Sequence, residues 1–428
     1  MNAVLFFNAA VHTPADAGRP RGGADQGKIT CFDPGALVVD REKGTILAVG
    51  AAKTVENAFQ KQITASVDCG RQCLIPGFVD PHTHMCFARR REAEFAQRIA
   101  GSPYLDILKQ GGGILSSVQA VADTDENALY QATRRNVLAA LEHGTTTVEI
   151  KSGYGLDTVN ELKMLRVIER IGRSLPLDVV ATFLGAHAVP PAFRGRTEAY
   201  VDLVIDEMLP AVRQQGIARF CDVFCEKGVF SPAQSRRLLL AARGFQMGLK
   251  LHADEVNDLG GAGLAAELNA VSADHLLAAG DEGLRAMTRA GVVADLLPAT
   301  AYSLRKPYAR ARDMIRAGLP VALATDCNPG SSYTESMPFV FGLAVLNMHL
   351  TPAEALTAAT LNAAYAIKMA DRVGSLDAGK QADFLLLDGA SPAILAYHAG
   401  VSPVTAVYKK GIRVHIRPRP ADFFSQDG

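Results

Sequence analysis

The 428-residue sequence has no excess of charge of either sign. Lysine and arginine total 44, aspartate and glutamate also total 44, and the formal net charge is zero. This balance argues against a nucleic-acid partner or an anionic membrane surface bound through bulk electrostatics. The sequence also lacks an apolar run long enough to span a bilayer. We therefore expect neither a nucleic-acid nor a membrane partner.

Cysteines and targeting signals are equally sparse. The seven cysteines are an odd number scattered along a long chain, which favours reduced thiols in a cytoplasmic protein over a disulfide framework. The N-terminal stretch "MNAVLFFNAAVHTP" has a short apolar run, no basic flank before it and no small-residue cleavage pattern. It is predicted to be a first strand, not a signal peptide.

The two ends of the sequence share a β-rich pattern. Residues 1–72 contain short strand patterns such as "GALVVDREKGTILAVG", and residues 371–428 return to them in "ADFLLLDGAS" and "VTAVYKKGIRVHIRP". Short apolar runs separated by glycine turns are typical of strands. We expect residues 1–72 and 371–428 to form one small, sandwich-like β-domain.

The central residues 73–370 alternate strand-like and helical patterns. The eight strand candidates are "LIPGFVDPH", "GTTTVEIKSG", "LDVVATFLGAH", "RFCDVFCE", "GLKLHADE", "AVSADHL", "GVVADLLPAT" and "PVALATDCNPG". Eight strands alternating with helices predict an α/β fold, a parallel (β/α)8 barrel of the TIM type. A doubly wound open sheet is the alternative, because the number of strands does not show that the sheet closes.

The first of these strands leads into "VDPHTHMCFARRR", in which two histidines are two residues apart. Residues i and i+2 of a strand point to the same side, so His82 and His84 would project together. Two converging imidazoles suit a divalent metal such as zinc. A His-x-His pair also occurs on solvated strand edges, so further ligands must come from elsewhere in the chain.

Polar residues stand at the ends of the other predicted strands, where a barrel of this kind places its catalytic groups. They are Lys151, Tyr154, His187, Glu226, His252, Asp254, Glu255, Asp274, His275, Asp326 and Asn328. Three histidines and one carboxylate suit a single zinc or similar first-row ion with a position left for water. We predict the ligands His82, His84, His252 and Asp326. For His252 and Asp326 a strand-end cap or a structural hydrogen bond is the alternative.

Several motifs resemble known sequences. "PGFVDPHTH", the histidines of the fifth and sixth strands, "ATDCNPG" and "GSLDAGKQADFLLLD" resemble the amidohydrolase superfamily. Within it, "EIKSGYGL", "TFLGAHAVP", "CDVFCEKGVFS", "LHADE" and "LATDCNPGSS" resemble the imidazolonepropionase family. The resemblance runs from about residue 70 to 390. "LPATAYSL" departs from it, where a glycine is expected in the middle.

The resemblance implies a reaction and roles for residues. The reaction is hydrolysis of the cyclic amide of 4-imidazolone-5-propanoate to N-formimidoyl-L-glutamate in histidine degradation, with one zinc or iron ion per chain and a homodimeric enzyme. It implies catalytic roles for Asp326, His275 and Glu255. Substrate-binding roles are implied for Arg91, Tyr104, Tyr154, His187, Glu255, Asn328, Gly330 and Ser331. Glu226 stands where two-metal relatives can carry a bridging lysine, which favours one metal and a structural role for Glu226.

Three alternatives compete with this interpretation. "GGAGLAA", which begins at Gly260, fits a dinucleotide-binding fingerprint. His252 and Glu255 already occupy the preceding strand end, so the glycines are expected to serve helix packing instead. A nucleobase deaminase would share the metal and the barrel but would not need a carboxylate-binding Arg91. A catalytically inactive scaffold would normally have lost metal ligands, whereas this sequence keeps all four.

Overall fold

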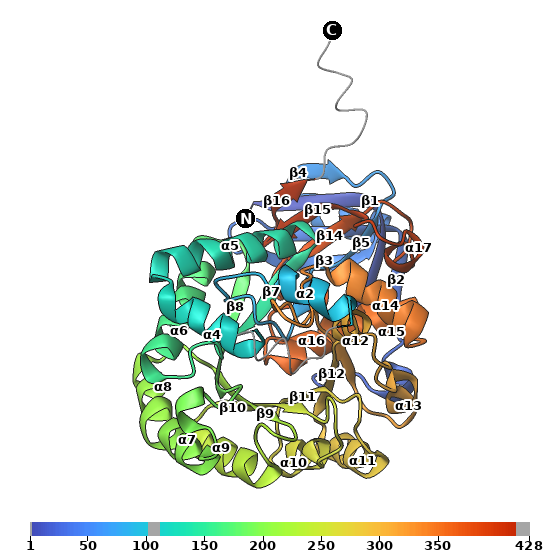
Figure 1. The fold of residues 1–428 in the computed structure, drawn as a ribbon. Helices are drawn as coiled ribbons and strands as arrows, with labels where there is room; N and C mark the ends of the chain where they lie inside the picture. The colour runs from blue at the N-terminus through green and yellow to red at the C-terminus, as the bar shows by residue number, and fades with distance from the viewer. Residues whose placement is uncertain (1, 102–111, 417–428) are drawn as a thin grey trace.

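The structure, a computed structural model, describes residues 2–101 and 112–416. It contains two eight-stranded sheets, one from the middle of the chain and one from both ends (Figure 1). Among the described residues, no helix has the length and apolar character needed to cross a membrane.

The central sheet is parallel, and strands that are consecutive in the chain are neighbours in the sheet. Its strands are β6 (Phe78–Asp80), β7 (Thr145–Lys151), β8 (Asp178–Ala186), β9 (Phe220–Cys225), β10 (Gly248–Ala253), β11 (Ser272–His275), β12 (Val293–Leu296) and β13 (Val321–Leu323). A parallel bridge between Thr83 and Cys327 joins the residues that follow the first and last strands. The predicted barrel is therefore confirmed, and the open-sheet alternative is wrong.

Helices surround the barrel (Figure 1). They are α2 (Glu92–Ile99), α4 (Ile114–Asp123), α5 (Glu126–Glu142), α6 (Thr158–Ser174), α7 (Thr197–Leu203), α8 (Leu209–Gln215), α9 (Pro232–Gly244), α10 (Gly261–Glu267), α11 (Asp281–Ala290), α12 (Pro298–Leu304), α13 (Ala311–Arg316), α14 (Met337–Asn347), α15 (Pro352–Ala359) and α16 (Leu361–Ala366). Local signals fix several of their starts. Ser231 and Gln234, for example, form a reciprocal capping box at α9, which satisfies amides that the helix itself leaves free.

The second sheet draws strands from both ends of the chain, as predicted. It consists of β1 (Ala3–Pro14), β2 (Ile29–Asp40), β3 (Thr45–Ala51), β4 (Ile63–Asp68), β5 (Cys73–Pro76), β14 (Phe384–Leu387), β15 (Val404–Lys409) and β16 (Ile412–Ile416). Their order is β16-β15-β14-β5-β1-β2-β3, and β4 also pairs with β1. Two helices lie between strands of this sheet in the sequence: α1 (Ala52–Phe59) between β3 and β4, and α17 (Ile394–Tyr397) between β14 and β15.

The expectation that "LIPGFVDPH" is one strand is wrong. The chain breaks at Gly77, so that β5 pairs with β14 of the end sheet while β6 pairs with β7 of the barrel. Gly77 lies against Thr146, and a Cβ atom at this glycine would come within 2.2 Å of the Thr146 Oγ1 atom. Only glycine fits this close approach. Residues 73–76 therefore join the end sheet, although the predicted domain boundary lies between residues 72 and 73. The domain boundaries at residues 72/73 and 370/371 stay a prediction.

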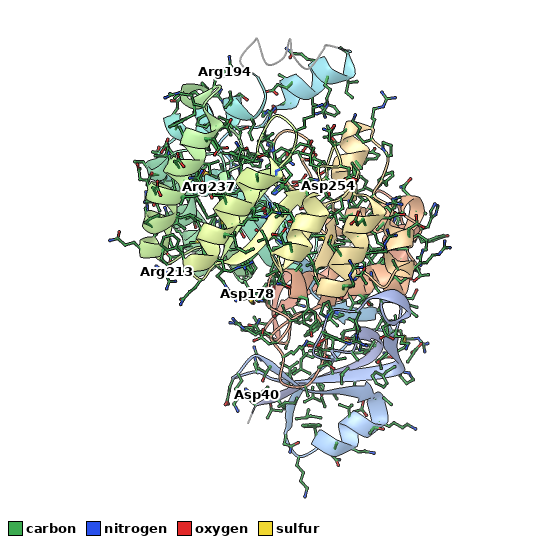
Figure 2. All side chains as sticks on the ribbon, turned by 90° about the horizontal axis from the view of Figure 1, so that it is seen from below. Asp40, Asp178, Arg194, Arg213, Arg237 and Asp254 are labelled. Atoms are coloured by element: carbon green, nitrogen blue, oxygen red, sulfur yellow. The ribbon has the colours of Figure 1, made fainter. Side chains whose placement is uncertain are left out.

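Alternating side chains of β14 link the end sheet to the barrel. Phe384 packs on Phe6 of β1, with ring centroids 4.8 Å apart, inside a core that the end strands build. Leu385 points the other way, into the barrel's core. Lys409 of β15 also forms ion pairs with Asp178 at 2.7 Å and Asp383 at 2.5 Å. Figure 2 shows Asp178 of β8 close to the junction of the two parts.

A chain shortened to residues 73–370 is expected to aggregate. It would lose Leu385 and its neighbours, which cover an apolar part of the barrel near Gly144 and Phe78. An uncovered apolar patch of this kind promotes association. Size-exclusion chromatography and thermal unfolding check this expectation. A monomeric fragment that unfolds at the temperature of the full chain would show that the end sheet is not needed to cover the barrel.

Candidate metal centre and active site

Closure of the barrel brings together the two ends of its strand order. The amide of Asp326 donates to the carbonyl of His82 at 3.1 Å, and the amide of His84 donates to the carbonyl of Cys327 at 3.0 Å. Asp326 lies three residues after β13, so this pairing sets its carboxylate beside both histidines that follow β6. The sequence spacing alone could not show this neighbourhood, because it depends on closure.

The His84 Nε2 atom lies within 3.5 Å of a donor atom of each of the other three predicted ligands. The Nε2 atom of His84 lies 3.3 Å from the Nε2 atoms of both His82 and His252. The Asp326 Oδ1 atom lies 3.6 Å from the His82 Nε2 atom and 3.5 Å from that of His84. Two ligand atoms about 2.1 Å from a tetrahedral ion are roughly 3.4 Å apart. The spacing and the donor types therefore fit one first-row metal ion.

Carboxylates on the far side of two imidazoles orient the rings. The His82 Nδ1 atom lies 2.6 Å from Asp274 Oδ2, and the His252 Nδ1 atom lies 3.1 Å from Asp222 Oδ2. A carboxylate only accepts, so the Nδ1 atom carries the proton and the Nε2 lone pair is free for a metal. Asp222 and Asp274 were not assigned roles from the sequence. The sequence signal that could have found them is a polar residue on the inward-facing side of β9 and of β11.

Burial sets the protonation of the site. It holds the pKa values of His82 and His84 well below the usual range and lowers the pKa of His187 to about 3. Burial also works against the charged form of His252, but the Asp222 carboxylate outweighs it and raises that pKa. Burial raises the pKa of Asp326 to about 6. The neutral imidazoles of His82 and His84 are the form that binds metal.

Asp326 is held by a residue that the sequence did not suggest. The Thr300 hydroxyl of α12 donates to Asp326 Oδ2 at 2.5 Å, which leaves the Oδ1 atom facing the histidines. Asp326 has φ +52° and His275 has φ +78°. Non-glycine residues in this left-handed region are costly, and such strain concentrates at functional sites.

His275 and Glu255 lie on the same side of the barrel mouth. The His275 Nε2 atom is 3.9 Å from Glu255 Oε2, and its ring centroid is 5.3 Å from that of His252. Nitrogen atoms of His82, His252 and His275 also lie within 4.8 Å of one another. His275 therefore lies at a ligand's distance from two of the four predicted ligands.

Tyr154 and His187 flank the metal centre. The His187 ring stacks on the His84 ring, with centroids 4.8 Å apart and planes at 16°. The Tyr154 ring centroid lies 5.4 Å from that of His187. The Phe224 ring, which the sequence did not suggest, lies 5.6 Å from His252. The planes of Tyr154 and Phe224 are tilted by 48° and 65° against that of His187, so the three rings enclose one side of the ligand imidazoles rather than forming one flat surface. Tyr104, also predicted to bind substrate, lies outside the described residues.

The turn after β13 uses its polar groups internally. Asn328 Oδ1 accepts from the amides of Gly330 and Ser331, both at 2.8 Å. The Asn328 side-chain amide donates to the Asp326 carbonyl at 2.7 Å and to the Ser331 hydroxyl at 3.0 Å. The turn therefore holds Asp326 in place. The predicted contacts of Asn328, Gly330 and Ser331 with substrate stay a prediction.

Arg91 differs from its two neighbours. Arg89 and Arg90 are exposed, whereas Arg91 is half-buried and pairs with Glu94 at 2.6 Å. It lies against Gly330, where a Cβ atom would approach the Arg91 Nη1 atom to 2.6 Å. The Nε atom of Arg91 has no hydrogen-bond partner among the described residues.

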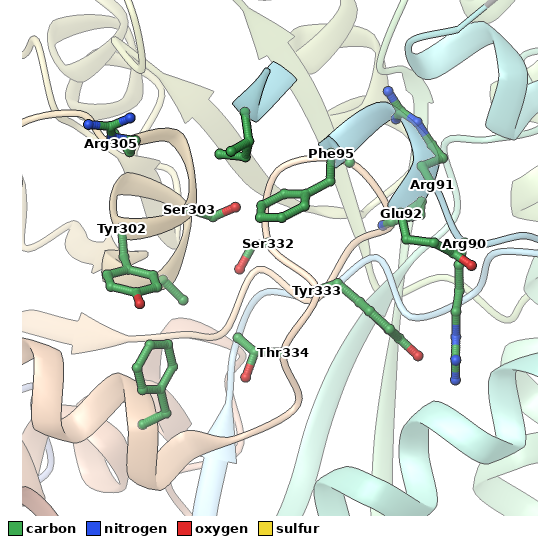
Figure 3. Close-up of a pocket in the computed structure, with 15 residues that line it drawn as sticks. Arg90, Arg91, Glu92, Phe95, Tyr302, Ser303, Arg305, Ser332, Tyr333 and Thr334 are labelled. Carbon is green, nitrogen blue, oxygen red and sulfur yellow. The ribbon is translucent and has the colours of Figure 1, made fainter. Parts of the chain in front are cut away.

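Arg91 and Gly330 line a cavity of about 690 Å³ (Figure 3). Its walls come from segments that follow β6, β12 and β13, so it opens at the C-terminal face of the barrel. The described residues that line it include none of the four candidate ligands. Two lining residues, Ala299 and Pro329, adjoin Thr300 and Asn328, which both hydrogen-bond Asp326, so the cavity borders the segments that hold this ligand. Arg91 stands on its wall.

Two other sequence features have structural roles. The Glu226 carboxylate accepts from the Asn257 side chain at 2.7 Å and the Val256 amide at 2.9 Å, which ties two loops together. The Asp254 carboxylate accepts from the amides of Gly261 and Ala262 at the start of α10, at 2.9 and 2.8 Å. The dinucleotide alternative needs those amides for a pyrophosphate, so the structure does not support it.

Known proteins resemble this chain in sequence and in fold. Residues 73–414 match the Amidohydrolase family. An imidazolonepropionase of Desulfotalea psychrophila is 64% identical over 97% of this chain and 100% of its own length. One of Syntrophobacter fumaroxidans is 61% identical over 96% of each chain. Guanine deaminase of E. coli has a similar fold, with a TM-score of 0.73, 13% identity, and coverage of 98% of this chain and 100% of the deaminase.

Proposed function

Since the chain belongs to the imidazolonepropionase family of amidohydrolases, we propose that its metal centre and the Arg91 cavity form one active site. The function is hydrolysis of the cyclic amide of 4-imidazolone-5-propanoate to N-formimidoyl-L-glutamate in histidine degradation. The observation that carries the site assignment is the position of the His84 Nε2 atom, which lies 3.3 Å from the Nε2 atoms of His82 and His252 and 3.5 Å from the Asp326 Oδ1 atom.

We propose that His82, His84, His252 and Asp326 hold one zinc or iron ion. Three nitrogens and one oxygen suit both metals. When bound, such an ion supplies Lewis acidity, which makes water a nucleophile near neutral pH and polarises a carbonyl. The carboxylates of Asp222 and Asp274 keep two of the imidazoles oriented toward it.

Side chains around the metal centre carry out the proton transfers of the reaction. Water attacks the ring carbonyl carbon, and the Oδ1 atom of Asp326 is placed to accept its proton, because Thr300 holds the other oxygen. His275 hydrogen-bonds the oxygen that gains charge. The ring C–N bond then breaks, and the proton that Asp326 took from water passes by way of Glu255, 3.9 Å from His275, to the leaving nitrogen.

The propanoate tail of the substrate explains Arg91. A guanidinium binds a carboxylate with two parallel hydrogen bonds that lysine cannot reproduce. Arg91 lines the cavity, and its Nε atom is free of protein partners among the described residues. Binding the tail there fixes the ring beside His84 and Tyr154, which lowers the barrier by positioning.

The oligomeric state and the cellular compartment of the enzyme are further parts of the proposal. We propose a homodimer in the cytoplasm, as the family resemblance implies. The seven cysteines are all free, and six of them are buried, which agrees with a reducing compartment.

The variant His275→Ala is expected to keep its metal while turnover falls by about 10²-fold or more. That is the scale for removing one group that stabilises the reacting oxygen. Metal content and kcat, measured on the same preparation, check this. Loss of the metal in this variant would instead make His275 a ligand and displace one of the four.

A further inference from the structure

Lys151 is a buried cation inside the barrel. It ends β7, and its side chain is fully inaccessible to solvent. Its Nζ atom lies 2.8 Å from Glu149 Oε1, 2.9 Å from Asp222 Oδ2 and 3.9 Å from Asp274 Oδ2. Burial alone would lower the pKa of this ammonium, but the three carboxylates raise it above its ordinary value, so the group stays charged.

Two of these carboxylates orient candidate metal ligands. Asp222 lies 3.1 Å from the Nδ1 atom of His252, and Asp274 lies 2.6 Å from the Nδ1 atom of His82. These ligands follow or end different strands of the barrel. Lys151 is therefore a common neighbour of the groups that orient two separate imidazoles.

The third carboxylate holds the backbone of the His-x-His motif. Glu149 Oε2 accepts from the amide of Thr83, the residue between the two histidines, at 3.2 Å. The Thr83 hydroxyl donates to the Glu149 carbonyl at 2.7 Å. The backbone amide of Lys151 donates to the Thr83 carbonyl at 2.9 Å. The same short segment thus fixes the position from which both imidazoles project.

We propose that Lys151 is a positioning residue for the metal centre, acting through Glu149, Asp222 and Asp274 on the histidine ligands. One fixed positive charge between the carboxylates lets them stay ionised and close together inside the barrel, where an uncompensated charge is costly. Without it they would repel one another, and the imidazoles that they orient would turn away from a shared point. This inference rests on the proposed metal centre.

Lys250 is the other buried lysine of this network, and its contacts differ. Its Nζ atom lies 3.5 Å from Asp274 Oδ2 and donates to the Ser272 hydroxyl at 2.6 Å. It contacts only one of the three carboxylates. The arrangement therefore points to Lys151 as the link between the ligands.

The test compares Lys151→Met with Lys409→Met in the full chain. Lys409 is a matched control, because it is also a buried lysine between two carboxylates, Asp178 and Asp383, but belongs to the end sheet. Zinc affinity is measured by competition with a chromophoric chelator, and the ligand-field spectrum is recorded after substitution with cobalt. Lys151→Met is expected to bind zinc about 10- to 100-fold more weakly, the scale for groups behind metal ligands. Its cobalt spectrum should also change.

Lys409→Met should lose thermal stability while its zinc affinity and cobalt spectrum match the parent's. Parental values in Lys151→Met, with only a lower melting temperature, would overturn the inference. If Lys151→Met does not fold, the double variant Glu149→Met/Lys151→Met removes the pair as a neutral unit, a change that buried pairs often tolerate; parental zinc affinity there would also overturn it. A parent protein that binds no metal would refute the proposed metal centre itself.

Discussion

The variant His252→Ala is expected to purify without its metal and to retain less than about one thousandth of the parent's kcat/KM. The His252 Nε2 atom lies 3.3 Å from that of His84, and the residue is buried with Asp222 behind it, so we predict it as a ligand. Losing the Lewis acid removes several kcal/mol of transition-state stabilisation. Elemental analysis of the parent should find about one first-row ion per chain, and analysis of the variant should find close to none.

The control is His398→Ala, which changes an exposed histidine on the end part of the chain. It should keep both metal and activity. Two ions per chain at full occupancy in the parent would contradict the single-metal assignment. A His252→Ala protein that keeps a full equivalent of metal would remove this residue from the ligand set.

Arg91→Ala is expected to keep the metal and the fold but to lose about 2–4 kcal/mol in kcat/KM, which is roughly 30- to 1000-fold. The loss follows from leaving the substrate's carboxylate without its partner in a partly closed site. Arg91→Lys should behave similarly, because one ammonium cannot replace the paired hydrogen bonds of a guanidinium. Steady-state kinetics with metal content measured in parallel check both variants.

Arg89→Ala and Arg90→Ala are the comparison variants, since both side chains are exposed; Arg89 is the stricter control, because Arg90 lines the cavity and Arg89 does not. They should stay within a few-fold of the parent. Equal behaviour of all three alanine variants, or near-parental kcat/KM in Arg91→Ala, would contradict the carboxylate assignment. Such results would favour the nucleobase deaminase alternative, whose substrates carry no carboxylate.

The sequence was sufficient for the barrel because the signals are local. Each strand-like run and each helix is recognisable on its own, and the pairing of consecutive strands follows the chain. The break at Gly77 was missed, because "CLIP" and "FVD" are both apolar and only a neighbouring strand shows that they belong to different sheets. Thr146, whose side chain excludes any Cβ atom at Gly77, lies about seventy residues away in the sequence.

Barrel closure brings His82, His84 and Asp326 together, and His252 lies beside His84, so the predicted ligand set stays a prediction with this geometry in its favour. The residues that orient them were not assigned. Asp222 and Asp274 lie within strands, where a single polar residue resembles any inward-facing position, and Thr300 lies on a helix after β12. Their roles depend on distances between strands. A search for polar residues at alternate, inward positions of the predicted strands would have added Asp222 to Lys151 and Asp274, which the strand ends already indicate.

The most direct test supplies the substrate itself. Urocanase generates 4-imidazolone-5-propanoate from urocanate in the cuvette, and the metal-loaded protein is added while the absorbance of the imidazolone is followed. The account predicts rapid decay with one equivalent of N-formimidoyl-L-glutamate formed, loss of this activity after a chelator, and recovery with about one equivalent of zinc or iron. Unchanged decay of the imidazolone in the presence of folded, metal-loaded protein would contradict it.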